Sequence, residues 1–363
     1  MSFKLREYVE PNFNDSKFLN APNAQLVKAP KDHVAPENYH AMSIYPEYFK
    51  IDGKWLLAKQ SRMDCVAIYK NDEIHVLEFR NIKKDDLVVC GRTENCEEGI
   101  YLHTNGFNET SEDKDVFAFR MNRSRETAFS RDYDEFYELL KHEKQHGKIV
   151  WVLGPAVSFD HDSKYAFSKL IDNGYVHAML AGNALATHDL EGSYLSTALG
   201  QDIYTQESIP NGHYHHLDTI NRVKYHDNIK TFIEKENISD GIIYSLEKNN
   251  IPYVLAGSIR DDGPLPIVIA DVYQAQEKMR EQIKDVTTVV CMATTLHSIA
   301  VGNMTPSYRI DKYGRIRQVY FYCIDISEFT ANKLADRGSL SAKSIITNAQ
   351  DFVVHVAKGL NIY

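Results

Sequence analysis

The hydrophobic positions of this chain follow two different rhythms. Between residues 39 and 102 they form short apolar runs, and an Asp52-Gly53 pair typical of a hairpin turn stands between the first two. The strand-like runs are 48–51, 54–58, 65–69, 74–79 and 87–90. Because closely spaced strands without intervening helices pack as a closed or double sheet, we expect a small β-barrel-like or sandwich-like domain here.

Beyond residue 130, single apolar runs alternate with helix-like segments. The runs that predict buried strands are 149–153, 176–180, 252–256, 287–292 and 319–324. The segments that predict helices are 130–146, 164–172, 218–225, 229–236 and 272–282. This alternation is typical of an α/β fold with a mostly parallel, doubly wound sheet, as in Rossmann-like dinucleotide-binding domains.

These rhythms divide the chain into three expected parts. Residues 1–38 are polar and dotted with prolines, so we expect an extended N-terminal arm that wraps the body or a neighbouring subunit. A small β domain should follow over residues 39–115 and end in the polar connector 105–115. The NAD-binding type of α/β domain should then occupy residues 116–363.

Composition narrows the class of protein. A chain of 363 residues with 43% hydrophobic content suits roughly two globular domains. The net charge of −9, without a basic stripe, argues against nucleic acid as a partner, and no apolar run reaches the roughly 20 residues of a membrane span. Five cysteines without CxxC pairing indicate reduced thiols and a cytoplasmic location. We expect a homo-oligomer, dimer or tetramer, because acidic enzymes of this kind are commonly symmetric.

The densest candidate chemistry follows the predicted strand at 252–256. A charged loop carries Arg260, Asp261 and Asp262 before a rigid Gly263-Pro264 turn. Open α/β sheets bind ligands beyond the carboxyl ends of their strands. A cation beside two carboxylates at such a place can hold an amino acid and move its protons. The alternative is a structural turn whose charges face water.

Polar side chains after other strands would converge on the same crevice. Asn183, His297 and Asp325 each follow a predicted strand, and Asp325 is a carboxylate of the kind that dinucleotide folds place on a ribose diol. Each has a structural alternative: a turn cap for Asn183, a core histidine for His297 and a helix N-cap for Asp325. Because the chain lacks GxGxxG, NAD cannot be assigned from that motif alone.

A histidine-rich stretch raises a metal alternative. His213, His215 and His216, together with His188, lack the helical spacing of a zinc protease, and no cysteine lies near them. We therefore expect no metal site and a polar lid near the crevice. The absence of a GxSxG elbow and of a Walker loop argues against a serine hydrolase and a kinase.

Taken together, several segments resemble one known family. They are 34–38, 45–46, 63–64, 154–156, 180–185, 254–266, 293–303 with Pro306, and 334–339. From about residue 30 onwards the chain resembles the archaeal-type ornithine cyclodeaminases, also called the LOR/SDH (lysine-oxoglutarate reductase/saccharopine dehydrogenase) conserved-region family. It is similar as well to the C-terminal module of the arginine dihydrolase/ornithine cyclodeaminase fusion. The stretch 254–266, VLAGSIRDDGPLP, is the most specific part of the match.

The resemblance implies an enzyme with tightly bound NAD that converts L-ornithine to L-proline and ammonia, within proline biosynthesis and arginine catabolism. Hydride leaves the α-carbon for NAD⁺, the δ-amine attacks the resulting imine, ammonia departs, and the cyclic ketimine takes the hydride back. By motif position, the resemblance implies NAD contacts at Asn183, Ala184, Asp262, Thr295, Leu296, His297, Asp325, Asp336 and Arg337.

The same resemblance suggests groups that handle the substrate. Asp261 would be the proton-transfer group and Arg260 the partner of the substrate carboxylate, while Asn38, Arg62 and Asp64 would come from the β domain. The alternative for Arg260 is an ion pair with one of the two aspartates that follow it, which would only set the shape of the loop.

Some departures from the family pattern leave other functions open. Residues 157–162 replace the usual turn after 154–156, residues 347–348 differ from the family's C-terminal Thr-Asp, residues 309–318 resemble an insertion, and a further N-terminal region of the family is not matched. One alternative is an NAD(P)-dependent saccharopine- or opine-type amino-acid dehydrogenase. The other is a non-catalytic regulatory protein that binds NAD or an amino acid.

Overall fold

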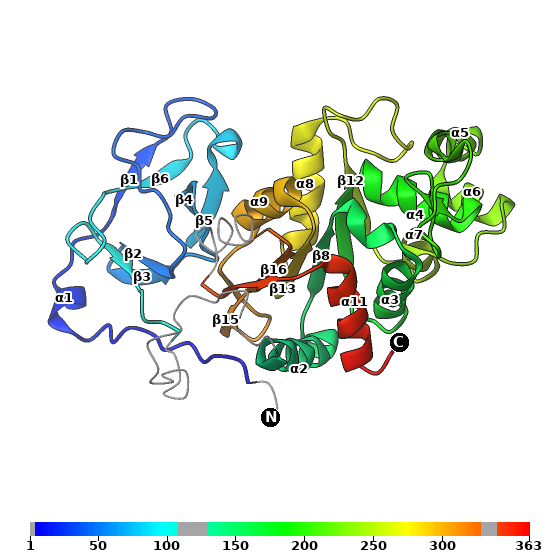
Figure 1. The fold of residues 1–363 in the computed structure, drawn as a ribbon. Coiled ribbons are helices and arrows are strands. Elements are labelled where there is room, and N and C mark those ends of the chain that lie inside the picture. The colour runs from blue at the N-terminus through cyan, green and yellow to red at the C-terminus, as the bar shows by residue number, and fades with distance from the viewer. Residues whose placement is uncertain (1–3, 108–129, 328–339) are drawn as a thin grey trace.

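The computed structural model describes residues 4–107, 130–327 and 340–363. Figure 1 shows two bodies side by side: a smaller β-rich body from the N-terminal part of the chain and a larger α/β body from the rest. The expected α/β class is confirmed, with a small sheet region before a mostly parallel sheet. The expected domain boundary near residue 115 lies outside the described residues.

The β body consists of two antiparallel sheets. One has the order β1-β6-β4-β5 and the other β3-β2-β7. The strands are β1 (Gln25–Lys28), β2 (Glu47–Ile51), β3 (Lys54–Leu57), β4 (Cys65–Lys70), β5 (Glu73–Glu78), β6 (Leu87–Cys90) and β7 (Ile100–Leu102). Inward side chains of both sheets, among them Phe49, Ile74 and Val89, form one core cluster, so the sheets pack face to face.

The N-terminal segment is not the featureless arm that its prolines predict. It contains α1 (Ser16–Leu19), and β1 pairs along its whole length with β6. The Phe18 ring is buried against Trp55 and Tyr101, and the Lys50 ammonium donates to the Phe18 carbonyl at 3.0 Å. The buried Phe18 and the pairing of β1 with β6 make this segment part of the β body.

The α/β body is built on a six-stranded parallel sheet in the order β12-β9-β8-β13-β16-β17. Its strands are β8 (Ile149–Leu153), β9 (Ala178–Gly182), β12 (Tyr253–Ala256), β13 (Thr288–Met292), β16 (Tyr320–Asp325) and β17 (Ala342–Ile346). Numbered along the chain, this is the order 3-2-1-4-5-6 of a Rossmann sheet. The chain reverses direction across the sheet between β8 and β13, which makes their carboxyl ends the expected ligand crevice.

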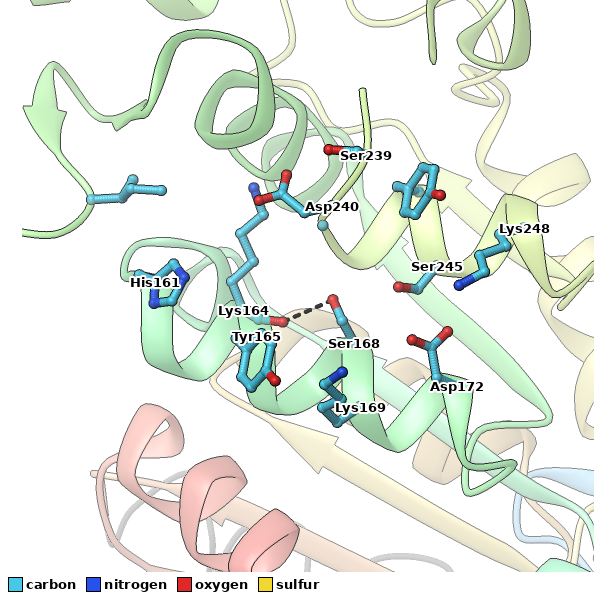
Figure 2. A pocket seen from close by; sticks show the side chains of 13 residues that line it. His161, Lys164, Tyr165, Ser168, Lys169, Asp172, Ser239, Asp240, Ser245 and Lys248 are labelled. Carbon is cyan, nitrogen blue, oxygen red and sulfur yellow. Dashed lines mark hydrogen bonds between the residues drawn. The ribbon is translucent and has the colours of Figure 1, made fainter. Parts of the chain in front are cut away.

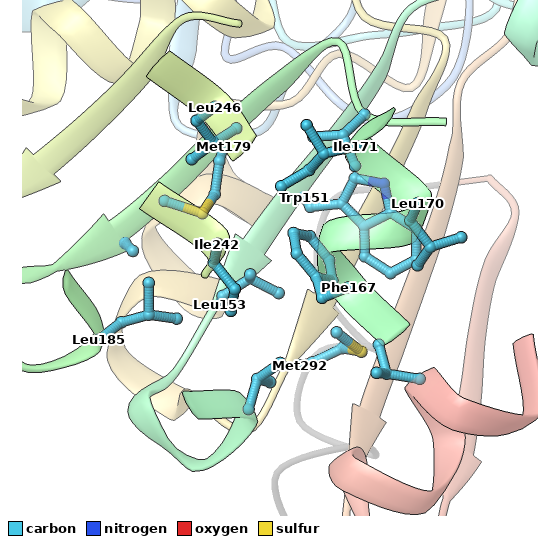
Figure 3. Packing of buried hydrophobic residues seen from close by; sticks show 14 of the residues in the cluster. Trp151, Leu153, Phe167, Leu170, Ile171, Met179, Leu185, Ile242, Leu246 and Met292 are labelled. Carbon is cyan, nitrogen blue, oxygen red and sulfur yellow. The ribbon is translucent and has the colours of Figure 1, made fainter. Parts of the chain in front are cut away.

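Helices cover both faces of this sheet. They are α2 (Ser130–His146), α3 (His161–Asp172), α4 (Asn183–Leu195), α5 (His215–Tyr225), α6 (Ile229–Lys235), α7 (Ile242–Lys248), α8 (Val272–Ile283), α9 (Thr295–Met304) and α11 (Ala349–Gly359). Alternate residues of β8 face opposite layers: Trp151 packs with Phe167 of α3 (Figure 3), whereas Val150 and Val152 pack under α8 and α9. Side chains of β8 thus point alternately to the two faces of the sheet. The face under α8 and α9 is the one turned toward the β body (Figure 1).

The contact between the two bodies runs through the segment after α9. Tyr308, on β14 (Tyr308–Ile310), is fully buried and its hydroxyl donates to the Ala58 carbonyl at 2.6 Å. The Ser307 amide donates to the Ser61 carbonyl at 3.0 Å. β14 pairs with β15 (Ile316–Gln318), so the expected insertion at 309–318 is a hairpin. No helix within the described ranges is long and apolar enough to cross a membrane.

Candidate functional site

The carboxyl edge of the parallel sheet is shaped by two glycines. A Cβ atom on Gly154, just after β8, would lie 1.8 Å from the Ala293 carbonyl oxygen, so the end of β8 packs directly on the end of β13. A Cβ atom on Gly182, at the end of β9, would lie 3.0 Å from Cε1 of His297. Only glycine lets the two chain segments and the imidazole approach this closely. These two glycines therefore leave a crevice floor made of main chain without side chains, at the switch point between β8 and β13.

Two helices start at this edge without a side-chain cap. The N-cap residues of α4 and α9 are Gly182 and Thr294, and neither makes a cap hydrogen bond through a side chain. By contrast, α3, α6, α8 and α11 are capped by the side chains of Asp160, Asn228, Asp271 and Asn348. Uncapped amides at a positive helix end attract anions. The two starts and the glycine floor therefore fit the phosphates of a dinucleotide.

The loop after β12 is held over the crevice by specific hydrogen bonds. The Leu265 amide donates to Oδ1 of Asn183 at 3.0 Å, and the Leu265 side chain is buried. The Gly257 amide donates to the Ile269 carbonyl at 2.8 Å, and the Lys224 ammonium donates to the Gly263 carbonyl at 3.0 Å. Asn183 thus ties the start of α4 to this loop, a role closer to the expected structural alternative than to ligand contact alone.

In the described structure, the charged side chains of this loop, Arg260, Asp261 and Asp262, do not form ion pairs with one another. Arg260 and Asp262 are exposed, and no ion pair joins Arg260 to either aspartate within the described part of the chain. Instead, the turn is closed by Oδ2 of Asp261, which accepts the Ser258 amide at 2.8 Å. The described partner of Asp261 in this turn is therefore the Ser258 amide and not Arg260.

His297 lies in the first turn of α9 and is half-buried over Gly182. Burial lowers the pKa of its imidazole below the ordinary value, and the Asp261 carboxylate acts in the opposite direction. No hydrogen bond to its ring nitrogens comes from any described residue. His297 is therefore a neutral imidazole, free to donate or accept, and close enough to Asp261 to sense its charge.

The remaining predicted cofactor contacts follow the same edge. Ala184, Thr295 and the strongly exposed Leu296 lie in the first turns of α4 and α9. Asp325 ends β16, next to β13, and its Oδ1 accepts the Ser327 amide at 2.8 Å. The predicted contacts Asp336 and Arg337 lie outside the described residues.

The predicted contribution from the β body is not brought to this edge. Arg62 is buried, pairs with the Glu78 carboxylate and donates to the Val76 carbonyl at 3.1 Å, and Glu78 also pairs with Arg280 of α8 at 2.9 Å. Arg62 lines a cavity of about 310 Å³ whose wall includes Met304, the last residue of α9. The ends of α8 and α9 lie toward the amino edge of the sheet, so Arg62 joins the two bodies instead of meeting Asp261.

Asn38 and Asp64, the other two candidates from the β body, are exposed residues with positive φ angles of 58° and 60°. Both therefore occupy turn positions. The sequence analysis missed Glu78 and Arg280, because the ion pairs that define them join residues far apart along the chain.

A second cavity, of about 230 Å³, lies between α3 and α7 (Figure 2). The buried Lys164 ammonium on its wall donates to the Asp189 carbonyl at 2.8 Å and to Oγ of Ser193 at 2.6 Å. The Asp189 carboxylate accepts the Ile242 and Ile243 amides at 2.9 and 2.7 Å and thereby caps α7. Because the charged groups of Lys164 and Asp189 already bind backbone and side-chain groups of α4 and α7, we assign this cavity a structural role and not a ligand-binding one.

The expected histidine lid is likewise built into helices. His188 belongs to α4 and pairs with Glu191 at 2.8 Å, while His215 begins α5 and contacts Oγ1 of Thr197 at 2.8 Å. α4 starts directly at Asn183, so His188 lies on a helix. Among the described residues, no group of three or more His, Cys, Asp or Glu side chains is arranged to hold a metal ion.

A parallel sheet of order 3-2-1-4-5-6, with a glycine floor and two open helix starts at its switch point, defines a dinucleotide-binding domain of the Rossmann class. Residues 136–356 match the family described as "Arginine dihydrolase ArgZ-like, C-terminal, Rossmann fold". The chain is also 40% identical to the ornithine cyclodeaminase of Methanocaldococcus jannaschii over 362 residues, covering 95% of this chain and 81% of that protein. The chain belongs to the ornithine cyclodeaminase family and is an enzyme of that family.

Solved structures agree with this assignment. A conserved LOR/SDH protein from Methanococcus maripaludis matches with a TM-score of 0.84 and 34% identity, over 94% of this chain and 98% of that one. The ternary complex of AgrE with ornithine and NAD⁺ matches with a TM-score of 0.58 and 30% identity, over 94% of this chain and 46% of that one. The predicted family resemblance is confirmed.

Proposed function

We propose that this protein converts L-ornithine to L-proline and ammonia with NAD as a cofactor that is reused within each turnover. The observation that carries the proposal is the convergence of the Asp261 loop, the half-buried His297 and two uncapped helix starts on the switch point of a Rossmann sheet. The ornithine cyclodeaminase relatives and the AgrE complex with ornithine and NAD⁺ support it.

The cofactor is NAD, and the residues at the edge of the sheet fit it. The amides at the start of α4, from Asn183 and Ala184, and of α9, from Thr295 to His297, would hold its phosphates over the glycine floor. Asp262, Asp325, Asp336 and Arg337 remain predicted contacts from the family motif. When bound, NAD takes hydride from the α-carbon of ornithine and gives it back to the cyclic product.

The protein's own residues would bind and protonate the substrate. The Arg260 guanidinium, which has no carboxylate partner in the described chain, would hold the α-carboxylate of ornithine. Asp261, fixed by the Ser258 amide, would accept the proton that the α-ammonium must lose before the α-carbon is oxidised. Asn38 and Asp64 stay predicted substrate contacts, whereas we assign Arg62 to the joint between the two bodies. The homo-oligomeric state and the cytoplasmic location stay predictions from the sequence.

The test needs no added cofactor. The purified protein is denatured and the released nucleotide identified, and the intact protein is incubated with L-ornithine while ammonia and proline are measured. We expect NAD in the extract and equal amounts of the two products. A requirement for added NAD(P) with a keto acid would indicate the dehydrogenase alternative. Bound NAD without turnover of ornithine would favour a regulatory protein, and failure to bind NAD at all would overturn the proposal.

A further inference from the structure

Cyclisation of ornithine requires a proton to move between its two nitrogens. The δ-ammonium must lose a proton before its nitrogen can attack the α-carbon, and the α-amino nitrogen must gain a proton to leave as ammonia. A single group that takes the first proton and returns it in the second step keeps the balance within the closed site. Asp261 is already assigned to the proton of the α-ammonium, and its Oδ2 accepts the Ser258 amide at 2.8 Å, so the transfer between the two nitrogens calls for a further group.

His297 is placed to be that second group. Its ring reaches from the first turn of α9 across the end of β8 to Gly182 on β9, so it lies directly over the switch point. Within the described structure, residues 154–158, residues 182–187 and the rest of α9 contain no ionisable side chain, and Asp325 ends β16, the strand beyond β13. Of the charged loop after β12, Asp261 is the group whose charge acts on His297, and Arg260 and Asp262 are exposed.

We propose that His297 is the proton shuttle of the cyclisation step, which rests on the proposed ornithine cyclodeaminase function. The imidazole takes a proton from the δ-ammonium as the bond between the δ-nitrogen and the α-carbon forms. It returns a proton to the α-amino nitrogen as the bond between that nitrogen and the α-carbon breaks and ammonia leaves. The imidazole is neutral before and after, so the step adds no net proton or electron to the protein.

The electrostatics of the crevice suit this task. Burial lowers the pKa of His297, so the imidazole is neutral at neutral pH and ready to accept a proton. The Asp261 carboxylate stabilises the imidazolium that forms in between. A pure cofactor contact would need neither property, and an ordinary core histidine would have a hydrogen-bond partner, as His40 has in Glu47 at 2.6 Å.

His297→Ala separates this role from cofactor binding. We expect the variant to keep its NAD and to reduce it when ornithine is added, because oxidation of the α-carbon precedes cyclisation. Ammonia and proline formation should fall about 10²–10⁴-fold, and imidazole added to the buffer should restore part of it. The acid limb of the kcat/KM pH profile should disappear in the variant. His355→Asn, which changes an exposed histidine on α11, is the matched control.

Three results would overturn the proposal. Unchanged product formation would exclude His297 from the chemistry, and loss of NAD with normal turnover on saturating NAD would make it a cofactor contact only. Absence of rescue by imidazole in a variant that is folded and retains NAD would leave it a packing residue. If the wild-type protein forms neither proline nor ammonia from ornithine, the proposed function itself fails, and the shuttle with it.

Discussion

Two clusters of charge in this protein differ in how completely the fold pairs them. At the joint between the two bodies, Arg62, Glu78 and Arg280 are largely buried and bound to one another. At the carboxyl edge of the sheet, Arg260 has no carboxylate partner in the described chain and His297 has no hydrogen-bond partner there. Arg260 is exposed and His297 is half-buried, so both side chains remain available to a ligand at the crevice.

Pairing also decides which helix ends are open. The side chains of Asp189 and four cap residues bind the starts of α7, α3, α6, α8 and α11, whereas the N-cap residues of α4 and α9, at the crevice, make no side-chain cap hydrogen bond. The comparison predicts that substitutions at the two clusters act on different properties.

The largest expected effect is at the crevice. In Asp261→Asn the amide oxygen can still accept the Ser258 amide, so the loop should keep its shape while the proton-transfer group is lost. We expect kcat/KM with ornithine to fall about 10²–10⁴-fold, with the free energy of unfolding unchanged within about 0.5 kcal/mol. The measurement pairs steady-state ammonia release with urea unfolding. Asp285→Asn, which changes an exposed carboxylate just before β13, is the control. A comparable loss of kcat/KM in that variant would contradict the assignment of Asp261 as the proton-transfer group.

The opposite pattern is expected at the joint. Glu78→Ala would leave two arginines, Arg62 and Arg280, without their shared carboxylate, and we expect the free energy of unfolding to fall by about 3 kcal/mol. Activity of the folded fraction should remain. Glu281→Ala, which breaks only the exposed pair with Lys278, should cost less than about 1 kcal/mol. If both variants unfold at the same urea concentration, the joint is not a stabilising cluster.

Much of the architecture could be predicted from the sequence, and the reasons for the failures are specific. The segments 130–146 and 149–153 match α2 and β8 residue for residue, because their apolar patterns face one core. α9 was not predicted because its apolar residues are spread around the helix, so no helical stripe is visible in the sequence. The location of Arg62 was not predicted, because the pairing of Arg62 and Arg280 with the same carboxylate, Glu78, joins residues far apart along the chain.

A smaller effect is expected for Asn183, which links the start of α4 to the loop after β12. Asn183→Ala removes the acceptor for the Leu265 amide, so the loop after β12 should open more often. We expect the Leu265 amide hydrogen to exchange about 10-fold faster and NAD affinity to weaken, with global stability nearly unchanged. Hydrogen exchange read by mass spectrometry reports the loop directly. Asn221→Ala, an exposed change on α5, should leave that exchange rate as it is.

The smallest expected effect is a pH dependence of stability in the β body, far from either charge cluster. Burial lowers the pKa of His40, but its hydrogen bond to Glu47 and the charge of Glu47 raise it more, so the net pKa lies above the ordinary value. A raised pKa in the folded state stabilises below the unfolded value near about 6.5 and loses that stabilisation as pH rises through the folded pKa. Urea unfolding between pH 6 and pH 9, on the scale of about 1 kcal/mol, should show this decline.

His40→Gln should remove that slope, because glutamine can still donate to Glu47 but does not titrate. The slope at the crevice should run differently: His297, whose pKa is lowered, must change activity on the acid side without a matching loss of stability at higher pH. A His40→Gln variant that keeps the wild-type slope would move its origin to another group.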